Sequence, residues 1–281
     1  MKDMAAFARL VDALRPWLEN LVVVGGWSHR LHRFHPLANP PAYLPLMTRD
    51  ADVAFSEKAS LGGDIGEALR LAGFREDFSS EHTPPIVQYQ LGREGGFYAE
   101  FLAPLRGSRH RRDGSPDATI ERAGITAQKL RYMELLLTIP WVVRLGNEVG
   151  VELEPPTEVA IANPVSFIAQ KLLIRNERRP EKRAQDALYV HDTIELFGGN
   201  LAALREIWRG GIAPPLPAKT ARTIEALCEE QFGAVTDVIR AAARIPQDRV
   251  IRPERMQQVC AFGLEQIFGI DQAALRQDVA G

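Results

Sequence analysis

The strongest constraint on the fold of this chain is a change in hydrophobic spacing near residue 163. Before it, apolar and polar residues alternate in runs such as "DADVAF", "PIVQYQL" and "GFYAEFLAP", and this period of two is typical of strands with one buried face. From Pro164 onward, apolar residues follow helical spacing. The sequence therefore predicts an α+β protein, with a mixed, mainly antiparallel sheet flanked by helices over residues 1–162 and a helical domain over residues 163–281.

The N-terminal part also contains turns and helices between the expected strands. An amphipathic helix should end near Asn20, and a buried strand over residues 21–24 leads into a glycine pair. Residues 36–45, "PLANPPAYLP", hold four prolines and cannot form a regular helix. Further on, we expect a helix over 61–73, a hairpin around Gly95 and Gly96, a helix around 126–138 and a hairpin that pairs "WVVRL" with "VGVEL".

Composition limits the classes of partner. A formal net charge of −2 gives no global attraction to nucleic acid or to an anionic membrane, and no apolar run approaches the roughly 20 residues needed to cross a bilayer. The two cysteines, Cys228 and Cys260, lie far apart in a sequence without an apparent leader. We therefore expect core thiols in a reduced, cytoplasmic protein that has no membrane partner.

Two carboxylates two residues apart mark the candidate site. On a strand, the Cα atoms of Asp50 and Asp52 would lie about 6.6 Å apart, with both side chains on one face. This spacing suits two carboxylates that share divalent cations. Glu100, on a later expected strand, is a candidate third ligand. An isolated Asp-x-Asp pair is also compatible with a plain solvated surface.

These pieces together resemble the nucleotidyltransferase superfamily that is built like DNA polymerase β. The matching segments are "VVVGGWS", "TRDADV" and "AEFL". The resemblance implies that Asp50 and Asp52 bind Mg²⁺ or Mn²⁺, and that Glu100 completes the set and helps to deprotonate the attacking hydroxyl. It also implies nucleotide or phosphate binding by the residues of the glycine motif and the acidic motif, namely Gly25, Gly26, Ser28 and Arg49.

The sequence departs from that superfamily in two ways. Gly26 and Asp50 are separated by 23 residues that include the proline-rich stretch, whereas many members have a shorter separation. Gly26 also stands where many members have a serine, so Ser28 is the candidate substitute for its hydroxyl.

The glycine pair and the histidines that follow it have alternative interpretations. Gly25 and Gly26 fit a phosphate-binding turn, and they equally fit a close contact between a strand and a helix. His29, His32 and His35 have a spacing that can hold a transition metal on a helix, but Pro36 disfavours helix at His35. A polar or substrate-facing helix surface is the favoured interpretation of these histidines, and His29 and His32 are the candidates for the substrate-facing part.

Two further groups of basic residues are candidates for phosphate binding. The loop that contains Arg106, Arg109, His110, Arg111 and Arg112 can guide a triphosphate or an RNA backbone, or it can be simply solvated. In the helical part, Lys171, Arg178 or Arg179, Lys182 and Asp186 resemble the "KL…R…KD" pattern of bacterial nucleotidyltransferase-like proteins, including the abortive-infection type toxins, although Gln185 replaces the usual lysine.

That second resemblance implies that Lys171 contacts the triphosphate, with Arg178, Lys182 and Asp186 as neighbours in the site. Without the resemblance, a lysine beside Phe167 and Ile168 is expected to extend along the core toward solvent. A relation to the toxins also implies an antitoxin protein as partner.

The leading hypothesis is therefore an enzyme that binds an NTP with Mg²⁺ in a cleft between the domains and transfers a nucleoside monophosphate to a hydroxyl acceptor. The acceptor is open among tRNA, a protein side chain and a small molecule. The alternative is a catalytically silent, regulatory module that binds a nucleotide or a partner protein, which would follow if the long insertion separates Gly26 from the acids.

Overall fold

The computed structural model describes residues 2–56, 58–79, 86–92, 96–108, 110 and 113–269. Its contacts divide the chain into two compact units. The first comprises Met1–Pro36 and Met47–Asn163, and the second comprises Leu37–Leu46 and Pro164–Gly281. The main division follows the change in hydrophobic spacing at Pro164, but the proline-rich segment groups with the helical unit. Independent folding of the two parts stays a prediction.

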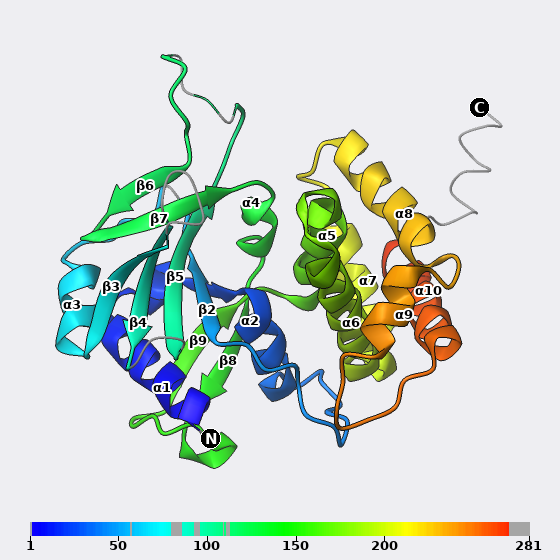
Figure 1. Ribbon diagram of the computed structural model, residues 1–281, viewed down its shortest axis with the longest axis horizontal. Helices are drawn as coiled ribbons and strands as arrows, with labels where there is room; N and C mark the ends of the chain where they lie inside the picture. Colours follow the sequence, from blue (N-terminus) through cyan, green and yellow to red (C-terminus); the bar gives the residue numbers. More distant parts are fainter. Residues whose placement is uncertain are drawn as a thin grey trace. The chain divides into compact units, whose positions relative to one another are not determined.

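The strands of the first unit form one sheet (Figure 1). They are β1 (Val22–Val24), β2 (Asp50–Ala54), β3 (Phe74–Ser79), β4 (Ile86–Leu91), β5 (Phe97–Pro104), β6 (Thr119–Arg122), β7 (Ile125–Leu130), β8 (Trp141–Leu145) and β9 (Thr157–Ile161). The main order is β3-β4-β5-β2-β1-β9-β8, and β7 joins β5 to β6. The pairs β1–β9, β2–β5 and β5–β7 are parallel and the others antiparallel. The predicted α+β class and the mainly antiparallel sheet are confirmed.

Helices cover one face of this sheet. The first unit contains α1 (Lys2–Leu14), α2 (Gly25–Leu31), α3 (Ile65–Leu71), α4 (Met133–Leu136) and the 3₁₀ helices η1 (Arg15–Asn20), η2 (His32–Phe34) and η3 (Asn147–Val149). Phe7 of α1 stacks on Trp27 of α2 at 4.1 Å between ring centroids, and Trp27 meets the edge of Phe97 on β5 at 5.7 Å. Buried aromatic side chains therefore hold α1 and α2 against the sheet.

The opposite face has a smaller apolar cluster at one end. Leu102 of β5 and Val24 of β1 pack there with Met133 and Leu136 of α4. Since α4 has only four residues, it covers one part of this face. Asp52 and Glu100 are the neighbours of Ala54 and Leu102 two positions earlier on the same strands, so they lie on this face beyond the apolar cluster.

Two expected elements of the first unit are wrong. Residues 126–138 do not form one helix, because Ile125–Leu130 forms strand β7 and only Met133–Leu136 is helical. Buried Ile125 and Ala127 alternate with half-buried Thr126 and Gln128. This alternation is the period of two that is typical of a strand.

The second wrong element is the hairpin of "WVVRL" with "VGVEL". β8 pairs instead with β9, from Trp141 opposite Ile161 to Leu145 opposite Thr157. Residues 147–149 form the 3₁₀ helix η3, and the backbone N–H groups of Val149 and Val151 both donate to the carbonyl of Gly146. This tight turn takes the chain away from β8.

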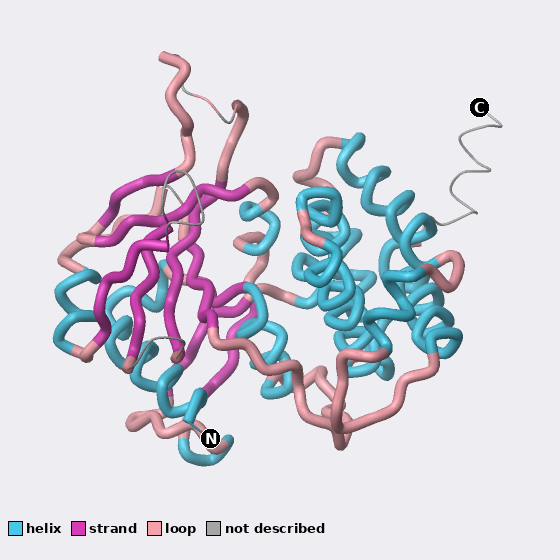
Figure 2. Tube along the Cα trace, viewed as in Figure 1, coloured by secondary structure: helices cyan, strands magenta, loops and turns pink. Residues whose placement is uncertain are grey.

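The second unit consists of packed helices (Figure 2). They are α5 (Pro164–Ile174), α6 (Pro180–Leu196), α7 (Leu201–Ile207), α8 (Ala218–Phe232), α9 (Asp237–Ala243) and α10 (Pro253–Phe268), with the 3₁₀ helices η4 (Arg175–Glu177) and η5 (Gly198–Asn200) and the π-helical turn η6 (Trp208–Ile212). Gly263 of α10 lies against Ile194 of α6, where a Cβ atom would collide. A glycine there permits the close approach of α6 and α10.

The proline-rich segment Leu37–Leu46, which we call the strap, is bound to the helical unit. The backbone N–H of Asn39 donates to the carbonyl of Leu196 at 2.8 Å, and the Asn200 amide donates to the carbonyl of Leu37 at 2.8 Å. The N–H of Leu44 donates to Asp248 at 2.9 Å. The proline-rich part of the insertion that separates Gly26 from Asp50 thus packs against α6 and the segment before α10.

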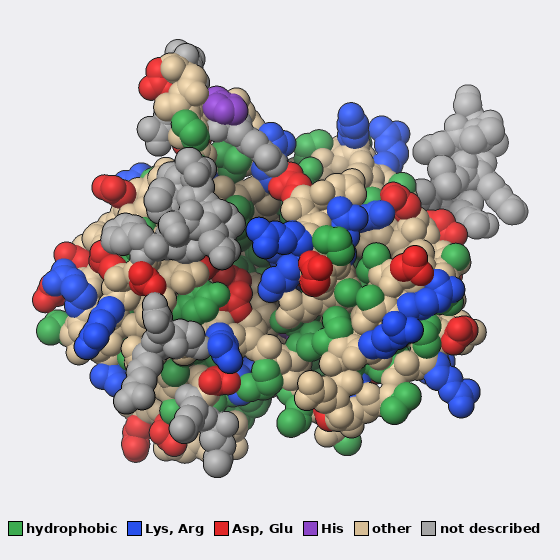
Figure 3. Space-filling model, in the orientation of Figure 1, with side chains coloured by type: hydrophobic (Ala, Val, Ile, Leu, Met, Phe, Trp, Pro, Cys, Tyr) green, Lys and Arg blue, Asp and Glu red, His purple; other side chains and the backbone are tan. Residues whose placement is uncertain are grey.

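Of the two cysteines that were expected to be core thiols, one lies in the core. Cys260 is fully buried, whereas Cys228 is half-buried, and both are free thiols. Burial raises the pKa of the Cys228 thiol to about 12, with a further contribution from Glu225. Basic and acidic side chains are interspersed on the face drawn in Figure 3. Among the described residues, no helix is both long enough and apolar enough to cross a membrane.

Candidate active site

Three carboxylates lie on one face of the sheet. β2 and β5 run parallel, with Asp50 opposite Tyr98 and Asp52 opposite Glu100. The intervening residues Ala51 and Ala99 are fully buried on the other face, while the acids and Tyr98 are half-buried. The alternation expected for these strands is therefore present, and it brings Asp50, Asp52 and Glu100 onto the same open surface.

Tyr98 reports on the electrostatics of this surface. Burial raises the pKa of its phenol, and the negative charges of Asp50, Glu100 and Asp52 raise it further, against a smaller opposing effect of Arg49. Tyr98 is thus surrounded by the three carboxylates and remains a neutral hydrogen-bond donor. Tyr98 was not predicted as a site residue, although its position two residues before Glu100 on one strand predicts the same face.

Neighbouring side chains donate hydrogen bonds to two of the acids, Asp50 and Glu100. The Thr48 hydroxyl donates a short hydrogen bond to Oδ1 of Asp50. The Gln88 amide on β4 donates to Oε1 of Glu100 at 2.8 Å. Gln88, like Tyr98, was missed at the sequence level, because its cross-strand position depends on the register of β4 with β5.

The glycine motif lies directly against the acidic motif. β1 and β2 are antiparallel with Val24 opposite Asp52, and Gly25 follows with φ +62°. A Cβ atom at Gly25 would collide with Oδ2 of Asp52. The long insertion therefore leaves the glycine motif within reach of the acids, and the premise of the silent-module alternative is wrong.

Ser28 and the two histidines lie in the interior, not on a surface that faces a substrate. Ser28, His29 and His32 are at most 3% exposed. The Ser28 hydroxyl and the Nε2–H of His32 both donate to the carbonyl of Ala162, at 3.0 and 2.8 Å. Burial, with the nearby His29, lowers the pKa of His32 to about 3, so the ring is neutral. The predicted phosphate contact of Ser28 and the substrate-facing role of His29 and His32 are therefore corrected.

His35 is separate from the other histidines. It follows η2 with extended backbone and stacks on Trp141 at 3.7 Å between ring centroids.

Since α2 has only seven residues, a phosphate role for Gly25 and Gly26 rests on the resemblance and not on the N-terminal end of this helix. That role stays a prediction.

The donor set of the three acids fits a hard cation, since it offers only carboxylate oxygens. In the described chain, however, the one set of three His, Cys, Asp or Glu side chains whose ligand atoms all lie within 4.8 Å of one another is His191, Asp192 and Glu195. Asp50, Asp52 and Glu100 are therefore spread more widely.

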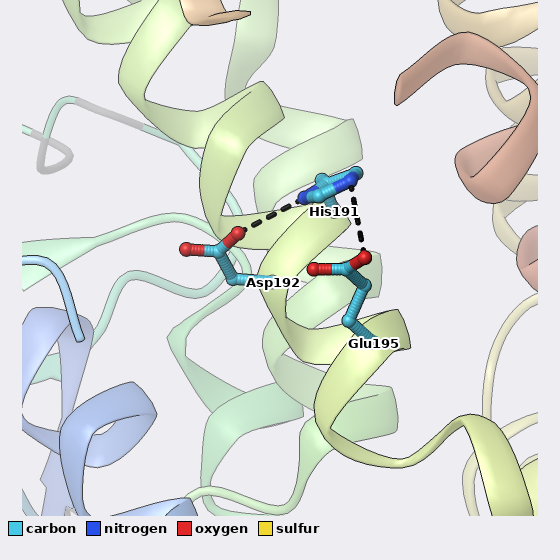
Figure 4. A group of neighbouring side chains, drawn as sticks. All are labelled: His191, Asp192 and Glu195. Atoms are coloured by element: carbon cyan, nitrogen blue, oxygen red, sulfur yellow. Dashed lines mark hydrogen bonds and ion pairs between the residues drawn. The ribbon is translucent and has the colours of Figure 1, made fainter. Parts of the chain in front are cut away.

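The group of His191, Asp192 and Glu195 on α6 is already engaged in contacts within the helical unit (Figure 4). Nδ1 of His191 lies 2.9 Å from Asp192, and both oxygens of Asp192 lie 2.6 Å from Nη2 of Arg249. The Tyr43 hydroxyl of the strap donates to Glu195 at 2.7 Å, and Arg249 stacks on the Tyr43 ring. Because a cation would compete with Arg249 for Asp192, we assign this group to attachment of the strap.

Two of the predicted basic residues of the helical unit, Lys171 and Arg178, lie beside Asp186. Nζ of Lys171 lies 2.8 Å from Oδ1 of Asp186, and Nε of Arg178 lies 3.1 Å from Oδ2 of the same carboxylate. The Lys171 side chain is 7% exposed, so the expectation that it extends to solvent is wrong. Lys182 instead donates to Gln185 at 3.2 Å on an exposed surface.

The structure describes Arg106 and His110 of the basic loop. Arg109, Arg111 and Arg112 lie outside the described residues, as does Gly95 of the expected hairpin turn. His110 is exposed and forms an isolated β-bridge with Pro116. A role of this loop in guiding a triphosphate or RNA stays a prediction.

Comparisons with known proteins identify the family of this chain. A search of the solved structures finds similarity to MenT4, a nucleotidyltransferase toxin from Mycobacterium tuberculosis H37Rv, with a TM-score of 0.38 and 12% identity over 98% of this chain and 85% of that chain. No curated protein matches the chain. The sequence pattern of a family described as Nucleotidyltransferase matches residues 2–211, which include both glycines and all three acids. Because this match spans more than half of the chain, the protein belongs to the nucleotidyltransferase family of enzymes.

Proposed function

We propose that this enzyme transfers a nucleoside monophosphate from an NTP to a hydroxyl acceptor, with Mg²⁺ or Mn²⁺ held by Asp50, Asp52 and Glu100. The observation that carries the proposal is the register that aligns Asp52 with Glu100 on one open face while Gly25 lies against Asp52. Paired carboxylates beside a glycine turn suit a metal-bound triphosphate.

In this reaction the acceptor oxygen bonds to the α-phosphorus of the NTP, and the bond from that phosphorus to the bridging oxygen breaks. Pyrophosphate leaves with the electron pair of the broken bond. Glu100 receives the proton of the attacking hydroxyl, and its hydrogen bond from Gln88 keeps the carboxylate oriented. The bound cations would supply positive charge to the triphosphate and to the charge that develops in the transition state.

The test is incubation of the protein with labelled NTPs, Mg²⁺ and a cell extract. Wild type is expected to label an acceptor, and Asp52→Asn and Asp50→Asn are expected to abolish labelling. Glu76→Gln, which alters an exposed carboxylate on β3 of the same sheet, should label as wild type does. Label that persists in the double Asp50→Asn, Asp52→Asn variant would overturn the assignment of the acids.

The nature of the labelled product identifies the acceptor. Ribonuclease removes label from a tRNA, protease removes it from a protein, and label that passes a small-pore filter belongs to a small molecule. The resemblance of the Lys171 segment to abortive-infection type toxins further leads us to propose that the enzyme arrests bacterial growth in the absence of an antitoxin. Expression of wild type should then stop growth, whereas expression of Asp52→Asn at an equal level should not.

A further inference from the structure

The helical unit contains a cavity that has about the size of one small ring. Its volume is about 120 Å³, and it lies among α5, α6, α8, α9 and the short connection between the last two. For comparison, an engineered cavity of roughly 150 Å³ in another protein binds one benzene molecule. A nucleoside, with its base and its sugar, exceeds this space. The volume therefore favours a small ligand that carries no more than a single ring.

One wall of the cavity is apolar. Phe232 at the end of α8 and Ile239 of α9 are buried, and Val238 beside Ile239 is half-buried. An aromatic side chain with two branched aliphatic ones offers a surface on which a flat ring can pack. This wall favours a ligand with a planar apolar part over a simple inorganic ion.

The charged side chains of the lining leave one positive charge in excess. Lys171 is paired with Asp186 at 2.8 Å. Arg175 is paired with Glu230 at 2.7 Å. Arg183 also lines the cavity, and within the described part of the chain its guanidinium has no carboxylate at ion-pair distance. Its Nε donates to a backbone carbonyl at 2.9 Å, so its terminal amino groups are available to an anion.

A single excess charge matches a carboxylate better than a phosphate. A phosphate monoester carries about −1.5 to −2 charges near neutral pH, which would leave negative charge in excess beside Asp186 and Glu230. A carboxylate carries one negative charge, and its flat geometry fits the planar fork of a guanidinium. Arg183 therefore favours a monocarboxylate.

A buried amide supplies a second donor. Nε2 of Gln231 is shielded from solvent and has no hydrogen-bond partner among the described residues, and Gln231 lines the cavity. A buried donor without an acceptor is unfavourable. A ligand with an acceptor oxygen at this place would satisfy it.

We propose that this cavity binds a small aromatic carboxylate of about the size of benzoate. The ring packs on the apolar wall, and the carboxylate pairs with Arg183 and accepts a hydrogen bond from Gln231. Such a ligand has neither a triphosphate nor a hydroxyl group. The proposal thus gives the helical unit a ligand other than the substrates of the proposed transfer reaction.

The first experiment measures binding of benzoate to the full chain by calorimetry in EDTA. Benzoate should bind at millimolar concentration or below, and it should raise the thermal midpoint because it binds the folded state. Benzylamine, which has a cation in place of the carboxylate, should not bind. The two-ring 2-naphthoate should bind at least about tenfold more weakly than benzoate. Absence of benzoate binding at millimolar concentration, or equal binding of benzylamine, would overturn the proposal.

Variants of the lining test the two contacts of the carboxylate. Arg183→Gln should weaken benzoate binding at least about tenfold, as expected for the loss of a charged contact. Its control is Arg222→Gln, which removes an exposed arginine of α8 outside the cavity and should bind as wild type does. The cavity-filling Val238→Trp should also weaken binding at least about tenfold.

Gln231→Leu separates a ligand role from a structural one. Because the amide nitrogen has no partner among the described residues, its replacement should leave the thermal midpoint without ligand equal to or above that of wild type. Benzoate binding should nevertheless weaken about threefold or more. Undiminished binding by correctly folded Arg183→Gln and Gln231→Leu would overturn the proposal.

Competition with nucleotide keeps this proposal apart from the proposed function. ATP should not displace benzoate from wild type, with or without Mg²⁺, and Asp52→Asn should bind benzoate as wild type does. Displacement by ATP would overturn the proposal, because the cavity would then belong to the nucleotide site. Benzoate binding without any transfer activity would sustain the cavity proposal and sink the proposed function. Transfer activity without benzoate binding would do the reverse.

Discussion

The carboxylate of Asp52 lies against the Cα atom of Gly25, at a distance that admits no side chain there. Gly25 also has φ +62°, a conformation that L-residues adopt only with strain. The residue is therefore glycine for two physical reasons, and one of them is the position of a candidate metal ligand.

Gly25→Ala should lower nucleotidyl transfer at least about tenfold, because the methyl group displaces the Asp52 carboxylate, in addition to a strain of roughly 1–2 kcal/mol. The matched control is Gly150→Ala, whose φ of +75° imposes similar strain where no atom lies within 4 Å of the added Cβ. Activity and thermal unfolding of both variants are the measurements. Equal activities in the two variants would contradict the functional role of this contact.

Gln88→Leu should raise the Mg²⁺ concentration needed for half-maximal activity, since Glu100 loses the donor at 2.8 Å that orients it. A hydrogen bond to a charged group contributes about 1.5–3 kcal/mol, so an effect of roughly tenfold or more in kcat/KM is expected. The neighbouring Gln90 donates to Asp77 instead, at 2.6 Å, which makes Gln90→Leu the control. Identical Mg²⁺ dependence of the two variants would exclude this role of Gln88.

Lys171→Met should destabilise the protein by about 1–3 kcal/mol, because Oδ1 of the buried Asp186 loses its partner while Oδ2 keeps the contact with Arg178. Adding Asp186→Leu should restore part of that stability in chemical denaturation, since the buried carboxylate oxygen without a partner is then removed. If Lys171 also contacts the NTP, the double variant regains stability but not nucleotide affinity. Recovery of both properties would show that the role of Lys171 is structural.

Arg249→Met should destabilise the protein by about 3–5 kcal/mol, because Asp192 has a side chain only 2% exposed and loses its bidentate partner. Tyr43→Phe removes the hydrogen bond to Glu195 and should cost about 1 kcal/mol. Chemical denaturation measures the loss of stability in each variant, and limited proteolysis measures whether the strap is released. A larger loss from Tyr43→Phe than from Arg249→Met would contradict this description of the strap.

His32 should make the protein less stable in acid. Its folded-state pKa of about 3 lies below the usual 6.5, so below pH 6.5 the unfolded chain binds the proton first. The corresponding stability is present above pH 6.5 and decreases by about 1.4 kcal/mol per pH unit toward pH 3. His32→Gln, which preserves a donor for Ala162, should have a flatter dependence between pH 7 and pH 5, unlike the exposed control His110→Gln. Parallel curves for wild type and His32→Gln would refute the effect.

The face shared by Asp50, Asp52 and Glu100 was predictable from the sequence, because the direction of a side chain on a strand depends on a local period of two. The change at Pro164 from sheet to helices was predictable for the same reason. β7 was misread as helix because its period of two rests on only two buried residues, Ile125 and Ala127, and its pairing with β5 and β6 decides that it is a strand.

Other features depended on contacts between residues far apart in the chain. Ser28 and His32 belong to the interior because the carbonyl of Ala162, 134 and 130 residues away, accepts from both. The sequence by itself determined the change from sheet to helices and the open face that carries the acids, since these follow from local periodicity. Only the tertiary structure decided that Gly25 meets Asp52, that Lys171 is paired with Asp186 and that the strap packs on the helical unit, because register, burial and ion pairing depend on which distant segments are brought together.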